Sequence, residues 1–276
     1  MNQFYEGVGI SKQAVHQYAR RQTLFDHRLM ELMSEADDIR RDHPGCGVEK
    51  MYYTLKPGFI GRDRFVETFM ELGYRLKRKR NYRRTTIAGK IYYPNKIKGL
   101  EINAPSVVWQ SDITYYKVGD KFYYAVFIID VYTKKIVGYE VSDHMRGTAN
   151  LKALKMALKN NKAPKIHHSD RGSQYTFKSS TDLLKSNTTT ISMALSAQDN
   201  AYAERINRTI KEEYLDHWKP QTFSQLKSQV NKAVKNYNNK RSHDHLEKKN
   251  PEEFINYWST LKPEERPVIT IFDNEN

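Results

Sequence analysis

The sequence is poor in cysteine, with a single residue, Cys46, among 276. One thiol excludes a disulfide framework and any zinc site built from two or more thiolates, so we expect a protein of a reducing cytoplasm. Long apolar runs are also missing, because no stretch approaches the roughly 18 residues of a membrane span. Met1 is not followed by a basic and then apolar leader. We therefore expect a soluble, unsecreted protein with no membrane partner.

Acidic residues are absent from residues 75–98, where ten of the residues are Lys or Arg. The whole chain carries a formal net charge of +14. Such a charge favours a polyanionic partner and a salt-sensitive affinity, although a basic run is also typical of a solvated linker. We predict that this run contacts DNA, through Arg78, Lys79, Arg80, Arg83 and Arg84.

The first 74 residues predict short helices separated by turn residues, over 11–21, 26–41, 47–55 and 62–72. Ser11 is expected to be the N-cap of the first. The last two helices flank Pro57-Gly58 and precede the basic run, which resembles a helix-turn-helix. We therefore predict DNA contacts at Arg62 and Arg64; the alternative is a helical bundle with no role on DNA.

From residue 107 onward the pattern changes to β-branched and aromatic runs. Three antiparallel strands are expected over 107–116, 122–129 and 135–141. Helices and strands then alternate, which indicates an α/β fold with a mixed sheet covered by helices. The later elements are expected over 149–160 (helix), 164–168 (strand), 177–186 (helix), 188–193 (strand), 201–218 (helix), 223–238 (helix) and 251–258 (helix).

Three acids occupy positions that favour metal chemistry. Asp112 lies inside an apolar, strand-like run, where an unpaired carboxylate is costly to bury. Asp170 follows a strand, with Gly172 allowing the turn, and open α/β sheets carry their chemistry at such strand ends. If the two strands are neighbours, these carboxylates converge and a helix can bring Glu204 as a third. Three carboxylates favour Mg²⁺ or Mn²⁺, and two such ions suit phosphoryl transfer.

Each acid also has a structural explanation: a hydrogen-bonded strand residue, a turn aspartate and a surface charge. Glu204 is expected in the second turn of its helix, with Asp199 or Asn200 as N-cap. Arg208 and Lys211 share its helix face, and we predict that they contact the DNA backbone.

Three sequence blocks carry a resemblance to a known family. They are Trp109 to Tyr115 (WQSDITY), His168 to Tyr175 (HSDRGSQY) and Asp199-Asn200-Ala201 with Glu204 and Lys211. Together with the run DVYTKKIVG at residues 130–138, they resemble bacterial insertion-sequence transposases that have two overlapping reading frames and a retroviral-integrase-like core. The resemblance covers most of the chain. It implies an RNase H-like fold, a DDE metal triad on Asp112, Asp170 and Glu204, and a DNA-contacting Lys211.

The resemblance also implies a function and partners. The expected activity is metal-dependent strand cleavage and strand transfer on the DNA of the element ends and the target. A homo-oligomer on DNA, and fusion to or partnership with an upstream-frame DNA-binding protein, are expected too. One departure is the separation of 33 residues between Asp170 and Glu204, slightly short for the family, with a loop at 194–198 that lacks glycine and basic residues.

Two other functions remain open from the sequence. An RNase H-type nuclease would share the acids, and a decayed or domesticated copy would bind DNA without catalysis. The transposase hypothesis divides the chain into a helix-turn-helix-like region (1–74), a basic linker (75–104), an RNase H-like core with C-terminal helices (105–262) and a tail (263–276).

Overall fold

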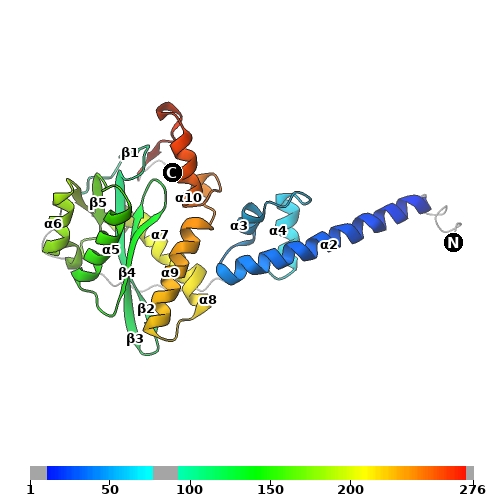
Figure 1. The fold of residues 1–276 in the computed structure, drawn as a ribbon, viewed down its shortest axis with the longest axis horizontal. Coiled ribbons are helices and arrows are strands. Elements are labelled where there is room, and N and C mark those ends of the chain that lie inside the picture. Colours follow the sequence, from blue (N-terminus) through cyan, green and yellow to red (C-terminus); the bar gives the residue numbers. More distant parts are fainter. Residues whose placement is uncertain (1–10, 77–92, 272–276) are drawn as a thin grey trace. The chain divides into compact units, whose positions relative to one another are not determined.

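The computed structural model describes residues 11–76 and 93–271, so the predicted DNA contacts Arg78, Lys79, Arg80, Arg83 and Arg84 lie outside the described residues. The chain forms two compact units (Figure 1). An N-terminal unit comprises Met1–Asp42 and Cys46–Arg75, and a C-terminal unit comprises His43–Gly45 and Leu76–Asn276. No helix in the described part of the chain is long and apolar enough to cross a membrane.

The N-terminal unit is α-helical, as expected, but its first helix is longer than predicted. One helix, α2 (Lys12–Asp42), replaces the two expected over 11–21 and 26–41. Residues 22–25 contain neither Gly nor Pro, so nothing ends the helix there. The Ser11 hydroxyl accepts a hydrogen bond from the Ala14 N–H at 3.1 Å, as an N-cap does. The core of the unit joins Leu32 and Ala36 to residues of α3 (Val48–Leu55) and α4 (Arg62–Glu71).

The two arginines predicted to bind DNA in this unit are engaged within it. Arg62 pairs with Asp63 at 2.7 Å, and the Arg64 guanidinium lies 4.5 Å from the centre of the Phe25 ring. The segment between α3 and α4 spans residues 56–61, longer than the three or four residues typical of a helix-turn-helix. The DNA role of these helices stays a prediction.

The C-terminal unit is built on a mixed five-stranded sheet in the order β4-β3-β2-β5-β6. β2, β3 and β4 are antiparallel neighbours, and β5 and β6 join β2 in parallel. The expected fold class and the expected strand pairing beside Asp112 are therefore confirmed. The strands are β2 (Val108–Val118), β3 (Lys121–Asp130), β4 (Ile136–Ser142), β5 (Ile166–Ser169) and β6 (Thr190–Met193).

Helices cover both faces of this sheet (Figure 1). On one face Phe127 and Ile129 of β3 pack with α7 (Ala201–Ile210) and α9 (Phe223–Asn239). On the other face Trp109 and Ile128 pack with α5 (Gly147–Asn160) and α6 (Lys178–Ser186). Successive side chains of β3 point to opposite faces of the sheet, so the unit has one buried apolar layer on each face.

Residues on either side of the core meet in a second, two-stranded sheet. β1 (Glu101–Ile102) pairs antiparallel with β7 (Ile269–Thr270). Buried Ile102 and Ile271 pack there against Phe254 of α10 (Pro251–Thr260). The C-terminal segment is thereby attached to the strand that precedes the large sheet.

The DVYTKKIVG run forms the turn between β3 and β4. The buried Asp130 carboxylate accepts hydrogen bonds from the backbone N–H groups of Ser106, Tyr132 and Thr133 and from the Trp109 indole. Burial raises the pKa of Asp130 and these donors oppose the rise. The aspartate of this block therefore has a structural role, because it ties two strands together at one end of the sheet.

Candidate active site

The site is built around Asp112, in the middle of β2. Parallel pairing places Ser111 opposite Ser169, so Asp170 leaves β5 beside Asp112. The Asp112 carboxylate accepts a hydrogen bond from the Ile113 N–H at 2.9 Å and one from the Asn207 amide of α7 at 2.7 Å. The strands that carry Asp112 and Asp170 are therefore neighbours, as expected.

Asp170 stands at the start of a tight turn. Its Oδ1 accepts a hydrogen bond from the Gly172 N–H at 2.9 Å, and Arg171 donates to the Ala194 carbonyl at 3.0 Å. These contacts fix the segment after β5 against the end of β6. The turn holds the carboxylate at the edge where two parallel strands end.

The helix that carries Glu204 is fastened to β2 by two amide side chains. The Gln110 amide donates to the Asp199 carbonyl at 3.1 Å and its oxygen accepts from the Ala203 N–H at 3.3 Å. The Asn200 amide donates to the Ser111 carbonyl at 3.1 Å. Because Asn200 uses its side chain in this way, it occupies the N-cap position without capping the helix. These bonds hold the start of α7 against Gln110 and Ser111, the two residues that precede Asp112 on β2.

Two details of this helix differ from the prediction. Glu204 lies in the first turn of α7, because the helix begins at Ala201. The expected uninterrupted helix also changes to a π-helical turn at Lys211–Leu215 before α8 (Asp216–Trp218). Such turns are found mostly as single insertions in α-helices, frequently at functional sites.

The three predicted acids influence one another. Burial raises the pKa of Asp112 to about 7, and the charges of Asp170 and Glu204 add to the rise. Burial also raises the pKa of Glu204, which Arg208 opposes and Asp170 favours. Mutual destabilisation of ionised carboxylates is expected where acids share a site, and a cation there would relieve it.

The described residues contain no group of three His, Cys, Asp or Glu side chains close enough to hold a metal ion as they stand. Asp112 is partly buried, whereas Glu204 is exposed. The donors nevertheless fit a hard cation, since all three are carboxylates and the charges of Asp170 and Glu204 disfavour ionisation of Asp112. A bound ion would require the three carboxylates to come closer together than they are here.

The two predicted DNA contacts on this helix differ in exposure. Arg208 is exposed beside Glu204. The Lys211 ammonium lies 4.9 Å from the centre of the Tyr115 ring. Burial lowers the pKa of Lys211, and the charges of Asp216 and Asp112 oppose the fall. Arg208 therefore lies near Glu204, and Lys211, which follows α7, lies near Asp112.

Several polar groups beneath the acids have no direct signal in the sequence. Asn207 holds Asp112, and its spacing of three residues from Glu204 is the only available sign. The side-chain oxygens of Asn200 and Asn207 are buried without a hydrogen-bond partner among the described residues, and the buried hydroxyls of Ser111 and Tyr175 interact with each other. Burial raises the pKa of Tyr175, and so do the charges of Asp170 and Asp112. Buried polar side chains therefore lie next to the acids.

The raised pKa of Asp112 predicts how the metal-free protein responds to pH. Between about pH 4 and about pH 7 the unfolded chain releases this proton while the folded chain keeps it, so the free energy of unfolding should fall as pH rises. Asp112→Asn should remove this fall and stabilise the protein at pH 8 by a few kcal/mol, since each pKa unit corresponds to about 1.4 kcal/mol. Thermal unfolding without divalent metal from pH 5 to 8 measures this.

The control for Asp112→Asn is Asp120→Asn, which removes an exposed carboxylate from the β2–β3 turn. It should keep the pH dependence of the unmodified protein. Equal pH profiles for Asp112→Asn and the unmodified protein would contradict the raised pKa.

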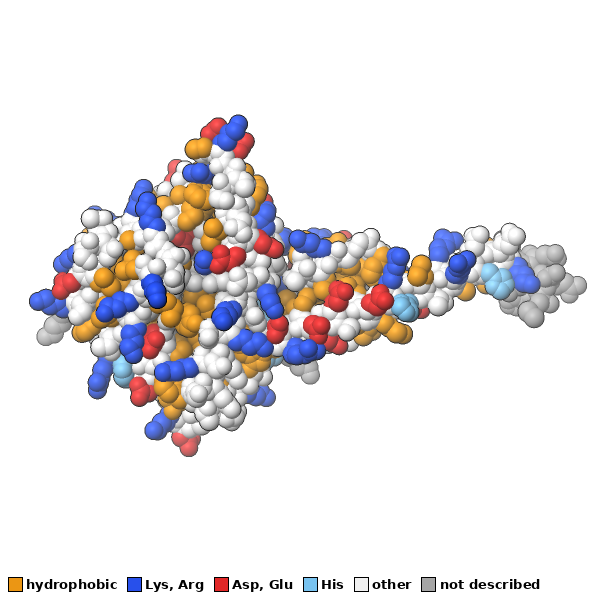
Figure 2. Space-filling model, viewed as in Figure 1, with side chains coloured by type: hydrophobic (Ala, Val, Ile, Leu, Met, Phe, Trp, Pro, Cys, Tyr) orange, Lys and Arg blue, Asp and Glu red, His pale blue; other side chains and the backbone are white. Residues whose placement is uncertain are grey.

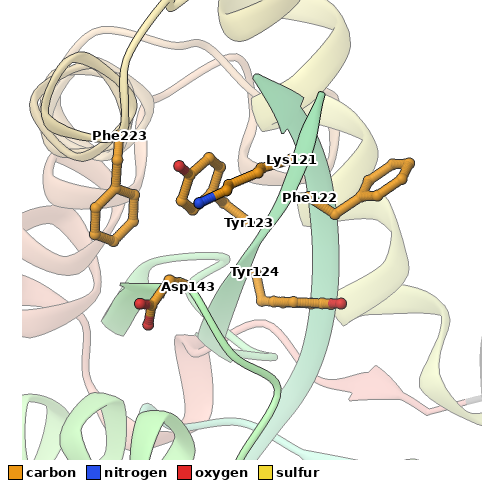
Figure 3. A pocket seen from close by; sticks show the side chains of 6 residues that line it. All are labelled: Lys121, Phe122, Tyr123, Tyr124, Asp143 and Phe223. Atoms are coloured by element: carbon orange, nitrogen blue, oxygen red, sulfur yellow. The ribbon is translucent and has the colours of Figure 1, made fainter. Parts of the chain in front are cut away.

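A separate pocket lies at the end of the β2–β3 hairpin (Figure 3). The Tyr123 and Phe223 rings stack there with centres 4.6 Å apart. None of the predicted site residues lines it; its lining comprises Lys121, Phe122, Tyr123, Tyr124, Asp143 and Phe223. The chemistry therefore has to be sought at the acids and not in this pocket.

Comparison with known proteins gives a consistent class. Two family models described as integrase core domain match residues 102–197 and 188–251. A simian T-cell lymphotropic virus intasome, solved in complex with PP2A regulatory subunit B56 gamma, resembles the chain with a TM-score of 0.52 and 14% identity. That match covers 65% of this chain and 64% of the other. The fold is thus that of an integrase catalytic core.

Sequence relatives are bacterial insertion-element proteins. A 31 kDa protein of insertion element IS600 from Shigella sonnei is 34% identical over 203 residues, covering 71% of this chain and 75% of that protein. The IS904 transposase of Lactococcus lactis is 31% identical, and the match covers 60% of this chain and 68% of that protein. The transposase InsF of insertion sequence IS3A from Escherichia coli is 29% identical, and the match covers 56% of this chain and 55% of that protein. The chain belongs to the IS3 family of insertion-sequence transposases.

Proposed function

We propose that this transposase catalyses metal-dependent DNA strand cleavage and strand transfer of its insertion sequence. The proposal is supported by the pairing of β2 with β5, which brings Asp170 beside Asp112, and by the charges of Asp170 and Glu204, which help burial to raise the pKa of Asp112 to about 7. Water attacks a phosphodiester at the element end, and the departing oxygen becomes a 3′-hydroxyl. That hydroxyl then attacks a phosphodiester of the target, so one bond forms as another breaks.

The side chains divide this work. Asp112 and Asp170 would hold Mg²⁺ or Mn²⁺ jointly, with Glu204 completing one of two sites. The bound ions supply activation of the attacking oxygen and stabilisation of the leaving oxygen. Asn207 keeps one Asp112 oxygen oriented through its 2.7 Å hydrogen bond. Gln110 and Asn200 hold the start of α7 on β2, so that Glu204 stays within reach.

DNA would be bound by basic groups from several parts of the chain. Arg208 and Lys211 would position the phosphates at the acids. Outside the core at 105–262, two segments would bind the duplex: the region 1–74, through Arg62 and Arg64, and the basic linker 75–104. The tail at 263–276 follows the core. Double-stranded element ends and target are the proposed substrates. A homo-oligomer, with an upstream-frame DNA-binding protein fused or bound, is the proposed assembly.

The direct test incubates the protein with duplex DNA carrying the element's own ends and Mg²⁺ or Mn²⁺. Labelled strands are mapped for nicks, and products are checked for a free 3′-hydroxyl and for joining to a second duplex. Metal-dependent nicks at the element ends are expected. Preferential cleavage of an RNA–DNA hybrid would indicate an RNase H-type nuclease instead, and binding without cleavage would indicate a non-catalytic copy.

Glu204 and Lys211 share one helix face but have different proposed roles, which kinetics can separate. Glu204→Gln removes a metal-binding charge, so cleavage should fall steeply even at saturating DNA. Lys211→Ala keeps the carboxylates and should cost about 1–3 kcal/mol of DNA engagement, which higher DNA concentration restores in part. Cleavage rates over a DNA titration give both results. Near-normal cleavage by Glu204→Gln in Mg²⁺ would show that another acid, such as Asp199 or Glu212, takes its place.

A further inference from the structure

A second basic segment covers the face of the sheet opposite α7. Residues 144–169 contain six Lys or Arg and no Asp or Glu. Within this segment, helix α5 buries Ala149, Ala153, Leu154 and Ala157 against the sheet. Its exposed side therefore carries the charge. The exposed lysines of the segment are Lys152, Lys155, Lys159, Lys162 and Lys165, which we call the α5 lysine stripe.

Helix α5 begins at the proposed catalytic end of the sheet. The start of α5 packs on the turn that follows Asp170, so closely that a Cβ added at Gly147 would lie 2.4 Å from the Phe177 Cβ. The 14 residues of α5 extend about 21 Å from there. Figure 2 shows Lys and Arg side chains gathered over the part of the C-terminal unit where Figure 1 draws α5. The stripe thus leads away from the proposed catalytic edge.

Little inside the described part of the chain balances these charges. Lys152 lies 3.5 Å from Glu140, and no ion pair joins Lys155 or Lys159 to a described residue. Lys155 stands three residues from Lys152 and four from Lys159, spacings at which like charges repel by about 0.2–0.5 kcal/mol. A face selected only for solubility would intersperse both signs. The arrangement therefore favours an external polyanion.

We propose that the α5 lysine stripe binds the phosphate backbone of the target duplex and holds it at the acids. The proposal rests on the proposed strand-transfer function. Besides the lysines, the exposed positions of α5 are Thr148 and Asn160. Lysine binds phosphate as a point charge, without the bidentate fork that reads base edges. A surface of this kind suits a target duplex, which we take to be bound without regard to its sequence. It suits less well an element end, whose sequence must be recognised.

The test compares Lys155→Ala/Lys159→Ala with Lys227→Ala/Lys235→Ala. The second pair removes the same charge from α9, which covers the other face of the sheet. Affinity for a duplex of unrelated sequence is measured from low to moderate salt without divalent metal. Strand transfer of a pre-nicked element end into a plasmid is then measured relative to nicking of an intact end.

The α5 variant should lower the slope of log affinity against log salt by about two, one for each lost phosphate contact. It should also lower the ratio of strand transfer to nicking several-fold, while the α9 variant changes neither. An unchanged slope, or the same change in both variants, would overturn the proposal. So would a lower slope with an unchanged ratio. Should the unmodified protein neither nick nor transfer, the proposed function fails, while the salt slope still decides whether α5 binds DNA.

Discussion

Asp170→Asn should abolish strand cleavage while DNA affinity stays within a few-fold of the unmodified protein. The side chain lies beside Asp112, where the two carboxylates would hold metal ions that supply several kcal/mol of transition-state stabilisation. At about 1.4 kcal/mol for each factor of ten, the loss is roughly a thousand-fold or more. Asparagine keeps an oxygen for the Gly172 N–H, so the turn itself should persist.

Cleavage of labelled element-end DNA and binding of the same DNA measure the two effects separately. Asp182→Asn is the matched control, because it removes an exposed carboxylate from α6 without touching the acids. It should leave both properties unchanged. Loss of cleavage together with loss of binding in Asp170→Asn would argue for a structural or DNA-positioning role and against metal ligation.

The positions of Asp112 and Asp170 could be predicted because each depends on short-range signals. Each acid lies in or just after a strand-like run, and parallel neighbours bring such runs side by side. The fastening of α7 could not be predicted, since Gln110 and Asn200 each bond to a residue about 90 positions away along the chain. A polar residue in a strand run shows no partner until the sheet is assembled. Local sequence therefore predicted the strand positions of Asp112 and Asp170 but not the amides that fasten α7 to β2.

Some helix boundaries were predicted wrongly for a related reason. Two helices were expected, over 11–21 and 26–41, but residues 22–25 contain no Gly or Pro that would separate them, and one helix runs through. The π turn at Lys211–Leu215 has no such signal either. It forms where tertiary bonds from other segments hold the backbone, and those segments lie far away in the sequence.

Such tertiary bonds join Glu213, in the π turn, to Arg241 and His43, which are distant in the sequence. The Arg241 guanidinium donates to both carboxylate oxygens at 2.7 and 2.8 Å, and the His43 Nε2 lies 2.7 Å from Oε2. Arg241 and His43 are buried, and Glu213 is 19% exposed. The Gly45 N–H donates to the Glu213 carbonyl at 2.7 Å, and an added Cβ there would lie 2.2 Å from the Glu213 Cα. Residues 43–45 belong to the C-terminal unit through these contacts.

Glu213→Gln should therefore be among the most destabilising single changes in the C-terminal unit. It leaves the Arg241 charge buried without its carboxylate, which costs about 3–5 kcal/mol in other proteins. For a unit of this size the melting temperature should fall by roughly 6–20 °C, at about 2–4 °C for each kcal/mol. Glu212→Gln removes the exposed neighbouring carboxylate and should change it little.

A double-mutant cycle shows whether the pair itself is responsible. Arg241→Met alone should also be costly, because it leaves the Glu213 carboxylate beside His43 without its bidentate partner. Combining Arg241→Met with Glu213→Gln should cost clearly less than the sum of the two single changes, since no buried charge then remains unpaired. Additive losses would mean that the two side chains act independently. In that case the π turn would owe its stability to the Gly45 contact and to the stacking of His43 on Tyr214, whose ring centres lie 4.4 Å apart.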